Sequence, residues 1–395
     1  MVSSVQNHPK PRVVVSVSGA FHCFDLAREL AERGNLEQIF STFPWARLKR
    51  EDVPRELVST FPIIHPALML LGRWGIDLPQ SIGRLLNYAN ATSFDHWVSR
   101  HVPACDVLVA ISGSGLTSGR NVQGRGGKYV CDRGSSHIRF QSQILAEENS
   151  RWGGNVNPVD PRTIQREQDE YAQADAITVP SEFARRSFLE MGVEEAKVHK
   201  IPYGVRLENF SPVSEPPANC FEVLFVGGVC FRKGIPYLLE AFERFNHPRK
   251  RLRIVGGVQK EIRSYLSGRR LEDVEFLGTV PQSQLKGIMS SSHVMVLPSV
   301  EEGLALVQAQ ALACGCPLIS STNTGGTDLF TNGIEGFEVP IRSPEAITER
   351  LQQLSEDPLL QKRMRGAAIA KVRSLGGWHT YGDQYLSVLR QLVLN

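Results

Sequence analysis

The chain has 395 residues, 42% of them hydrophobic and 22% charged, which is typical of an ordinary globular protein. Its 44 Lys and Arg nearly balance its 41 Asp and Glu, so the net charge of +3 does not indicate a nucleic-acid-binding protein. The length predicts two domains. The seven cysteines contain no CxxC pair, which predicts free thiols and no zinc site.

Short runs rich in Val, Ile and Leu alternate along the chain with amphipathic segments of helical length. In the first half, the predicted strands are 12–19, 36–42, 106–112, 128–134, 176–181 and 197–204. In the second half, they are 222–228, 251–257, 274–278, 294–299, 317–321 and 336–340. Nearly continuous apolar strands are typical of parallel sheets covered on both faces. The alternation therefore predicts two Rossmann-like α/β domains.

The domain boundaries follow from composition. The stretch 211–220, SPVSEPPANC, has three prolines and no periodicity, which indicates a linker. It separates a first domain over 1–210 from a second domain over 221–375. We expect a last helix over residues 376–395 that packs against one of the two domains. One option is that it returns to the first domain.

The N-terminal segment, MVSSVQNHPKPR, lacks the apolar core of a secretory signal. No run reaches the ~18 apolar residues that span a bilayer. We therefore expect a cytoplasmic protein. Two stretches, 45–50 and 73–89, mix Trp, Leu and basic residues as interfacial segments do, which raises the hypothesis of peripheral contact with the inner face of a membrane. An ordinary core helix and a solvated charge run explain them equally simply.

The stretch 225–242, FVGGVCFRKGIPYLLEAF, carries two cations where a predicted helix begins. Gly227 and Gly228 end the strand, and Arg232 and Lys233 follow. Backbone amides and cations at such a turn suit a diphosphate. The chain has neither the Walker A sequence nor the third glycine of the dinucleotide fingerprint, so a solvated surface turn is the competing interpretation.

The stretch 299–315, SVEEGLALVQAQALACG, predicts an amphipathic helix. Its apolar residues from Leu304 to Leu312 repeat at three- and four-residue spacing. Glu301 and Glu302 precede them, where carboxylates stabilise a helix start. Capping is thus the simplest interpretation of both glutamates.

Polar loops also follow strands elsewhere. The loop within 129–141 carries Asp132, Arg133 and His137. The loop within 16–24 carries Gly19 and is most simply a tight turn, as is the glycine-rich stretch after the strand 317–321. A lone histidine is more often structural than catalytic. Because ligands of parallel sheets bind beyond the carboxyl ends of strands, all these loops would face one cleft if the two domains faced each other.

In this order and spacing, the motifs resemble the retaining nucleotide-sugar glycosyltransferases of the GT-B fold, the group one class. The resemblance is strongest from Val223 to Pro340 and continues through DRGSSH and AITVPSEFARRSF in the first half. It implies an α/β GT-B fold with two Rossmann-like domains facing a central cleft. It also implies transfer of a sugar from a nucleoside diphosphate, UDP or GDP, to a glycan or lipid-linked acceptor, with no metal and no further cofactor.

The resemblance implies donor contacts in the second domain. Lys233 matches the family's diphosphate-binding lysine. The family's arginine position is Gly228 here, and Arg232 is expected to supply that charge, with Gly227 beside it. Backbone amides are expected to approach the sugar and phosphates from Gly303, Leu304, Ala305 and Leu306.

The family's two-glutamate motif matches Glu302, for the donor sugar, and Gln310, for the ribose. At 1.5 Å per helical residue, eight positions span about 12 Å, roughly the reach from sugar to ribose. Glutamine keeps one acceptor oxygen and loses the charge. Glu301 is then expected to be a capping or surface residue.

The resemblance implies acceptor-side roles for the first domain. His137 is expected in the cleft near the transferred sugar, with Gly19, Asp132 and Arg133 around it. The residues expected to be catalytic are Glu302, His137 and Lys233. The alternatives are a nucleotide-sugar epimerase on the same fold, a catalytically weakened binding protein and, less favoured, a nicotinamide dehydrogenase.

Overall fold

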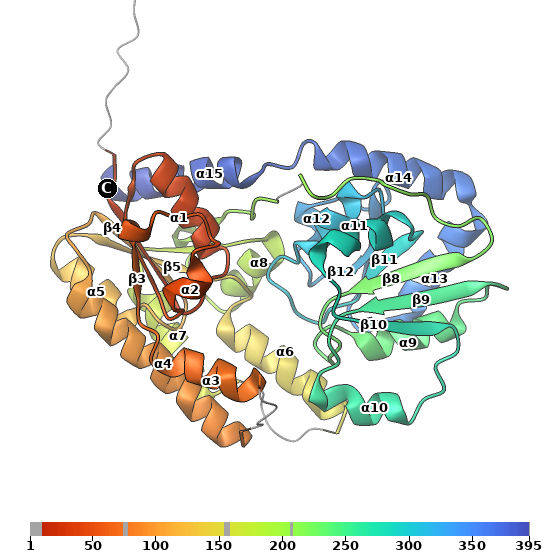
Figure 1. Cartoon of the computed structure of the whole chain (residues 1–395), viewed down its shortest axis with the longest axis horizontal. Helices are drawn as coiled ribbons and strands as arrows, with labels where there is room; N and C mark the ends of the chain where they lie inside the picture. The colour runs from red at the N-terminus through yellow and green to blue at the C-terminus, as the bar shows by residue number, and fades with distance from the viewer. Residues whose placement is uncertain (1–9, 74–77, 154–158, 206–207, 395) are drawn as a thin grey trace, which may run out of the picture.

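The computed structural model describes residues 10–73, 78–153, 159–205 and 208–394, which form two parallel sheets covered by helices (Figure 1). The first sheet has seven strands in the order β3-β2-β1-β4-β5-β6-β7, and the second has six in the order β10-β9-β8-β11-β12-β13. Neighbouring strands pair in parallel in both sheets. The predicted architecture of two Rossmann-like α/β domains is confirmed.

The first domain alternates strands and helices from its first strand onward. Its strands are β1 (Val13–Val17), β2 (Leu36–Ser41), β3 (Val58–Thr60), β4 (Val107–Ile111), β5 (Lys128–Asp132), β6 (Ala176–Val179) and β7 (Val198–Lys200). Its helices are α1 (Cys23–Glu32), α2 (Trp45–Leu48), α3 (Ile64–Arg73), α4 (Gln80–His101), α5 (Leu116–Gly124), α6 (Ile138–Arg151), α7 (Pro161–Gln173) and α8 (Glu182–Glu190). All five residues of β1 are buried because helices cover both faces of the sheet.

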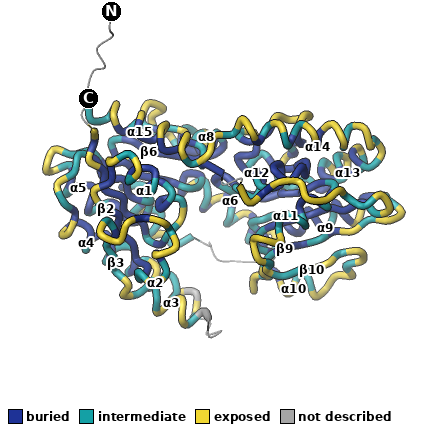
Figure 2. The backbone as a smooth tube through the Cα atoms, turned by 45° about the horizontal axis from the view of Figure 1, so that its top comes forward, coloured by how far each residue is buried: buried dark blue, intermediate teal, exposed yellow. Residues whose placement is uncertain are grey.

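The second domain repeats the pattern. Its strands are β8 (Phe221–Val226), β9 (Lys250–Val255), β10 (Val274–Gly278), β11 (Val294–Leu297), β12 (Leu318–Ser321) and β13 (Gly336–Val339). Its helices are α9 (Ile235–Arg244), α10 (Arg263–Ser267), α11 (Gln282–Ser290), α12 (Val307–Ala313), α13 (Pro344–Glu356) and α14 (Pro358–Val372). In Figure 2 the central strands form a buried interior, whereas the edge strand β10 is intermediate to exposed.

All twelve predicted strands are present, with ends shifted by up to a few residues. The strand that the sequence did not predict is β3. Its three residues, VST, are too short and too polar to display a hydrophobic pattern. Among the described residues, no helix combines the length and apolar character needed to cross a bilayer.

The last helix, α15 (Trp378–Leu394), lies against the first domain (Figure 1). Arg33, just after α1, donates to Asp383 at 2.9 Å, and Tyr385 is fully buried in the first domain's core. The chain therefore passes between the domains twice. The two passages touch where a Cβ on Gly204 would lie 2.3 Å from the amide nitrogen of Trp378, so only glycine fits there.

Helix α6 belongs to the first domain but packs into the core of the second. Ile144 is buried among residues of β8, α9 and α13. The ring of Trp152, just after α6, stacks on Phe231 with centroids 5.6 Å apart. Glu148 accepts hydrogen bonds from Tyr237 and Arg342, both at 2.8 Å. These contacts hold the carboxyl ends of the two sheets close together.

Candidate active site

The stretch after β11 is an irregular loop, not the start of a helix. Residues 299–306 join β11 to α12, which begins only at Val307. The prediction that Glu301 and Glu302 cap a helix is therefore wrong. The estimate of about 12 Å between Glu302 and Gln310 fails with it, because half of that segment is not helical.

Backbone hydrogen bonds fix this loop. The amide of Val300 donates to the carbonyl of Arg232 at 2.8 Å, and the amide of Glu302 donates to the carbonyl of Asn323 at 2.9 Å. The side-chain amide of Asn323 donates to the Val300 carbonyl at 2.9 Å. The loops after β8, β11 and β12 are thus tied together, and they hold Glu302 in one place.

Glu301 is fully buried between the two domains, not at the surface as predicted. Its Oε1 accepts from Ser135 at 2.5 Å and Ser136 at 2.7 Å, and its Oε2 accepts from Gln141 at 3.0 Å. Arg232 lies 3.6 Å from Oε2. Burial alone would raise the pKa of Glu301, but these hydrogen bonds and the Arg232 charge hold it below its ordinary value. Glu301 therefore joins the domains as a buried anion.

Arg232 and Lys233 follow β8 and converge on the carboxylate of Glu302. Arg232 Nη1 donates to Glu302 Oε1 at 3.1 Å, and Lys233 Nζ forms an ion pair with the same oxygen. Burial opposes the charge of Arg232, yet the neighbouring glutamates raise its pKa above the ordinary value. Two cations and one carboxylate are thus assembled beside the loop 299–306.

The two glycines at the end of β8 leave room next to these cations. Gly227 has a φ of 154°, and a Cβ on Gly228 would lie 3.2 Å from Nε2 of Gln259. A cavity of about 170 Å³ lies beside them, between α6 and this turn, and Arg232 and Gln259 line it. The Arg232 side chain is 38% exposed, so the guanidinium remains accessible.

Gly303 lies against Gly134 of the first domain, with no room for a side chain. A Cβ on Gly303 would lie 1.9 Å from the carbonyl oxygen of Gly134, and its own carbonyl accepts from Ser181 at 2.6 Å. Of the four backbone amides from Gly303 to Leu306, those of Gly303, Leu304 and Leu306 have no acceptor among the described residues. The amide of Ala305 instead donates to the Thr324 carbonyl at 3.4 Å. Three of the four predicted amides are therefore free to bind a ligand oxygen.

Gln310 lies in the first turns of α12 and is partly buried. Its side chain makes no hydrogen bond to any residue that the structure describes, unlike Gln308, which is buried and accepts from Ser320 at 2.7 Å. Gln308 therefore has a structural role, and the amide of Gln310 is available to a ligand.

In the first domain, Asp132 ends β5 and holds a histidine. Its Oδ2 lies 2.7 Å from Nε2 of His22, and its Oδ1 accepts from Thr178 at 3.0 Å. The ring of His22 lies against Tyr203, with centroids 4.3 Å apart. Cys23 adds a sulfur, so nitrogen, sulfur and oxygen atoms lie within 4.8 Å of one another. Burial and Asp132 raise the pKa of the Cys23 thiol well above its ordinary value, which disfavours the thiolate that a metal would need.

Arg133 and His137 lie inside the first domain. Arg133 donates to Glu167 at 2.6 Å and organises the loop that follows β5. His137 is 4% exposed, caps α6, and lies between the rings of Tyr171 and Phe188 at 4.9 and 5.0 Å. Burial lowers the pKa of His137 to about 4, so the ring is neutral. These contacts correct the prediction that His137 faces the cleft.

The sequence did not reveal the pairing of His22 with Asp132. His22 follows β1 and Asp132 ends β5, two strands that β4 separates in the sheet, and the strand order cannot be read from the sequence. The sequence signal available for this pair was a polar residue at or just beyond the carboxyl end of each strand. Gly19, with a φ of 136°, lies in the same loop as His22, as predicted for a tight turn.

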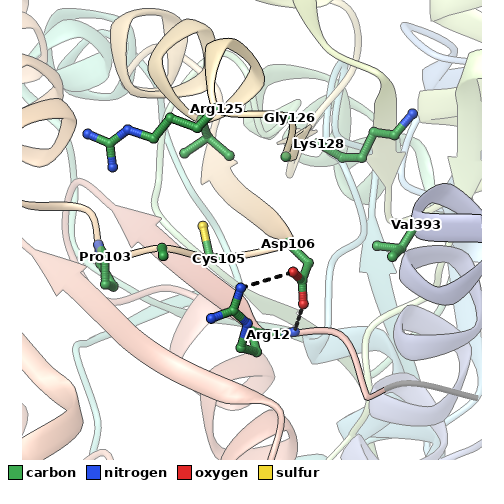
Figure 3. Close-up of a pocket in the computed structure, with 11 residues that line it drawn as sticks. Arg12, Pro103, Cys105, Asp106, Arg125, Gly126, Lys128 and Val393 are labelled. Atoms are coloured by element: carbon green, nitrogen blue, oxygen red, sulfur yellow. Dashed lines mark hydrogen bonds and ion pairs between the residues drawn. The ribbon is translucent and has the colours of Figure 1, made fainter.

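Another pocket, of about 240 Å³, lies at the opposite edge of the first sheet (Figure 3). Arg12, which precedes β1, is paired there with Asp106 at 3.2 Å. In Figure 3 the charged ends of Arg125 and Lys128 point in opposite directions, so the cations do not converge on one ligand. Parallel sheets bind ligands at the carboxyl ends of their strands, and this pocket lies at the amino ends.

Comparison with known proteins divides the chain at the connection between the sheets. The Glycosyltransferase Family 4 profile matches residues 19–209, and the Glycosyl transferases group 1 profile matches residues 208–371. The two matches follow one another along the chain. Together they include both sheets apart from β1, which precedes residue 19.

Two related proteins are similar in sequence to this chain over more than half of its length. A glycosyltransferase of Methanocaldococcus jannaschii (MJ1607), itself uncharacterized, is 29% identical over 368 residues, which are 88% of this chain and 87% of that protein. D-inositol 3-phosphate glycosyltransferase of Kribbella flavida is 25% identical over 293 residues, 68% of this chain and 69% of that protein. For several other relatives, the match covers less than half of their own length.

Among solved structures, HepE of Anabaena in complex with UDP and glucose is similar over 96% of this chain and 100% of that chain, with a TM-score of 0.69 and 15% sequence identity. At that identity the likeness concerns the fold. The consecutive profile matches, the named relatives and the shared fold lead to one assignment: the chain belongs to the group 1 glycosyltransferases of the GT-B fold.

Proposed function

We propose that this glycosyltransferase moves a sugar from a UDP- or GDP-sugar to a hydroxyl of a glycan or lipid-linked acceptor, with retention of the anomeric configuration. The observation that carries the proposal is the convergence of Arg232, Lys233 and Glu302 beside free backbone amides. The UDP and glucose in the HepE structure support the donor class. The names of the relatives support transfer rather than epimerisation, a dehydrogenase reaction or binding alone.

In this proposal, donor binding changes the ion-pair partners of the two cations. The diphosphate takes Arg232 and Lys233 from Glu302, and the released carboxylate then accepts from hydroxyls of the donor sugar. As the glycosidic bond breaks, negative charge grows on the leaving diphosphate. Cations and amides already fixed around it stabilise that charge. The leaving phosphate takes the acceptor proton, so this route uses no protein base and no metal.

Lys233→Ala should weaken binding of the nucleoside diphosphate by about 10-fold or more, because a hydrogen bond to a charged group contributes roughly 1.5–3 kcal/mol. Thermal shift against UDP, GDP, ADP and dTDP first identifies the nucleotide, since a bound ligand stabilises by mass action. The matched control is Lys362→Ala on α14, where the side chain is exposed. If Lys233→Ala and Lys362→Ala bind the nucleotide with equal affinity, Lys233 does not contact the diphosphate. That result would contradict the proposed donor site.

The reaction itself separates the competing functions. Incubation with the sugar nucleotide that binds best should release free nucleotide in step with a glycosylated product. An isomerised sugar nucleotide would indicate an epimerase instead. Binding without any turnover would indicate a weakened, binding-only protein.

We propose that Gln310 contacts the ribose of the donor. A neutral amide contributes about 1 kcal/mol per hydrogen bond, and a carboxylate contributes roughly 1.5–3 kcal/mol. Gln310→Glu should therefore tighten nucleotide binding up to about 10-fold, and Gln310→Ala should weaken it about 5-fold. Titration calorimetry measures both, with Gln284→Ala on α11, also exposed, as the control. An unchanged affinity in both Gln310 variants would place the ribose elsewhere.

We also propose peripheral contact with an anionic membrane surface through α3 and the start of α4. Large apolar side chains are 40–63% exposed here, namely Ile63, Met69, Leu70, Ile82 and Leu85. Arg47 of the basic stretch 45–50 donates to Met69 at 3.1 Å, so cations lie beside the apolar helix. Residues 74–77 of the second predicted stretch lie outside the described residues. In Figure 2, α3 lies at the periphery of the first domain.

Vesicles containing phosphatidylserine should sediment the protein at low salt, whereas phosphatidylcholine vesicles should not, because basic and apolar contacts act together. The double variant Leu70→Glu, Leu85→Glu should remain in solution. Leu359→Glu, at an equally exposed position on α14, should sediment like the native protein. Sedimentation of the double variant would show that this face is not the contact.

A further inference from the structure

The loop after β1 lies next to the loop that carries the free amides. A Cβ on Gly134 would lie 3.4 Å from Cε1 of His22 and 2.9 Å from the hydroxyl oxygen of Tyr203. The carbonyl of the same Gly134 touches Gly303 of the second domain. One residue therefore separates the His22 ring from the loop proposed to hold the donor.

The polar atoms of this cluster are arranged to receive a hydroxyl. Asp132 accepts from Thr178 on one oxygen and lies against Nε2 of His22 on the other. A carboxylate at Nε2 fixes the proton on that nitrogen, which leaves Nδ1 as an acceptor. Among the described residues, Nδ1 has no hydrogen-bond partner. The hydroxyl of Tyr203 is buried and also lacks a partner there.

An exposed aromatic residue, Phe21, directly precedes His22 in the same loop. Phe21 is 62% exposed, although burial of its ring would be favourable. Its φ of 41° is rare for a bulky residue, and such strain persists where the surroundings or function require it. Its ring lies over Gly19, whose Cβ would be 2.9 Å from Phe21 Cε2. The turn therefore holds the ring at the surface, next to His22.

We propose that Phe21, His22 and Tyr203 form the acceptor subsite, and that the acceptor presents a sugar ring. The ring stacks on Phe21, and a hydroxyl next to the attacking one donates to Nδ1 of His22 while Tyr203 donates to a neighbouring oxygen. Asp132 is a positioning residue. The assignment rests on the proposed transfer reaction. There, the acceptor oxygen bonds to the anomeric carbon, the bond to the diphosphate breaks with its electron pair, and the hydroxyl proton passes to the leaving phosphate.

The test measures binding of small glycosides without turnover. Saturation-transfer NMR of the full chain uses methyl α-D-glucopyranoside, methyl α-D-galactopyranoside and methyl α-D-mannopyranoside, each with and without UDP or GDP. At least one glycoside should give a signal with the native protein. Phe21→Ala should reduce that signal at least 5-fold, and Phe21→Trp should restore it. His22→Asn and Asp132→Asn should also reduce it.

The controls are His247→Asn, after α9, and Leu359→Ala, on α14, which should bind the glycosides like the native protein. All variants should keep the native nucleotide affinity. The assignment is overturned if no glycoside binds the native protein, or if Phe21→Ala binds as the native protein does. If the native protein binds no nucleotide, the donor proposal is contradicted instead. Glycoside binding measured without nucleotide would still test this subsite.

Discussion

Glu302→Ala should reduce sugar transfer by about 100-fold or more while nucleoside diphosphate binds as well as before or more tightly. The two effects have opposite signs because Glu302 plays two parts. In the free protein its carboxylate occupies Arg232 and Lys233, so its removal frees both cations for the diphosphate. With the donor bound, the sugar loses charged hydrogen bonds that contribute roughly 1.5–3 kcal/mol each.

Steady-state transfer rates and calorimetric titration with the nucleotide measure the two effects on the same variant. Glu302→Gln is the informative control, since it keeps the shape and removes the charge. Its nucleotide affinity should resemble that of Glu302→Ala, and its transfer rate should lie between those of alanine and glutamate. A native transfer rate in Glu302→Ala would remove this residue from the active site.

Glu301→Ala should lower the midpoint of thermal unfolding by roughly 6–12 °C. Removing one partner of a buried ionic network costs about 3 kcal/mol or more, and each kcal/mol shifts the midpoint by about 2–4 °C in a domain of this size. The loss is large because Ser135, Ser136 and Gln141 all donate to Glu301 and would lose this acceptor, and Ser136 is fully buried. Scanning calorimetry measures the shift.

The pH dependence of stability should identify the same carboxylate. The pKa of Glu301 in the folded protein lies below its ordinary value of 4.5. Its stabilising contribution is therefore complete above about pH 4.5 and is lost as the pH falls through the lower, folded value. The difference in midpoint between the native protein and Glu301→Gln should shrink over that range. Glu349→Gln, at an exposed position on α13, provides the comparison, and a midpoint unchanged by Glu301→Ala would contradict the network.

Much of the fold could be predicted because buried parallel strands are written in the sequence as short apolar runs. β8, with the sequence FEVLFV, is buried along its whole length, and its boundaries were nearly correct. β3 was missed because three residues cannot show a period. The order of the strands depends on packing between distant segments, which leaves no local signal.

The position of a site residue can be expected from the sequence where it depends on neighbouring residues, as for Lys233, which follows a glycine-ended strand, but its role in donor binding stays a prediction. It was not predictable where a role depends on the partner domain. Glu301 and Glu302 are neighbours of one type, yet the first is buried against the other domain and the second meets the cations. His137 was misplaced for a similar reason, because the aromatic rings that enclose it come from α7 and α8.

The two chain passages that touch at Gly204 and Trp378 limit how the halves of the protein can move. A single connection would act as a swivel and permit twisting in any direction. Two connections that touch at one point restrain twisting, and they favour rotation about one axis through that point. Opening would then separate Phe231 from Trp152 and Gly303 from Gly134 in a single swing about that point. Entry of the donor and release of the nucleotide would follow the same path.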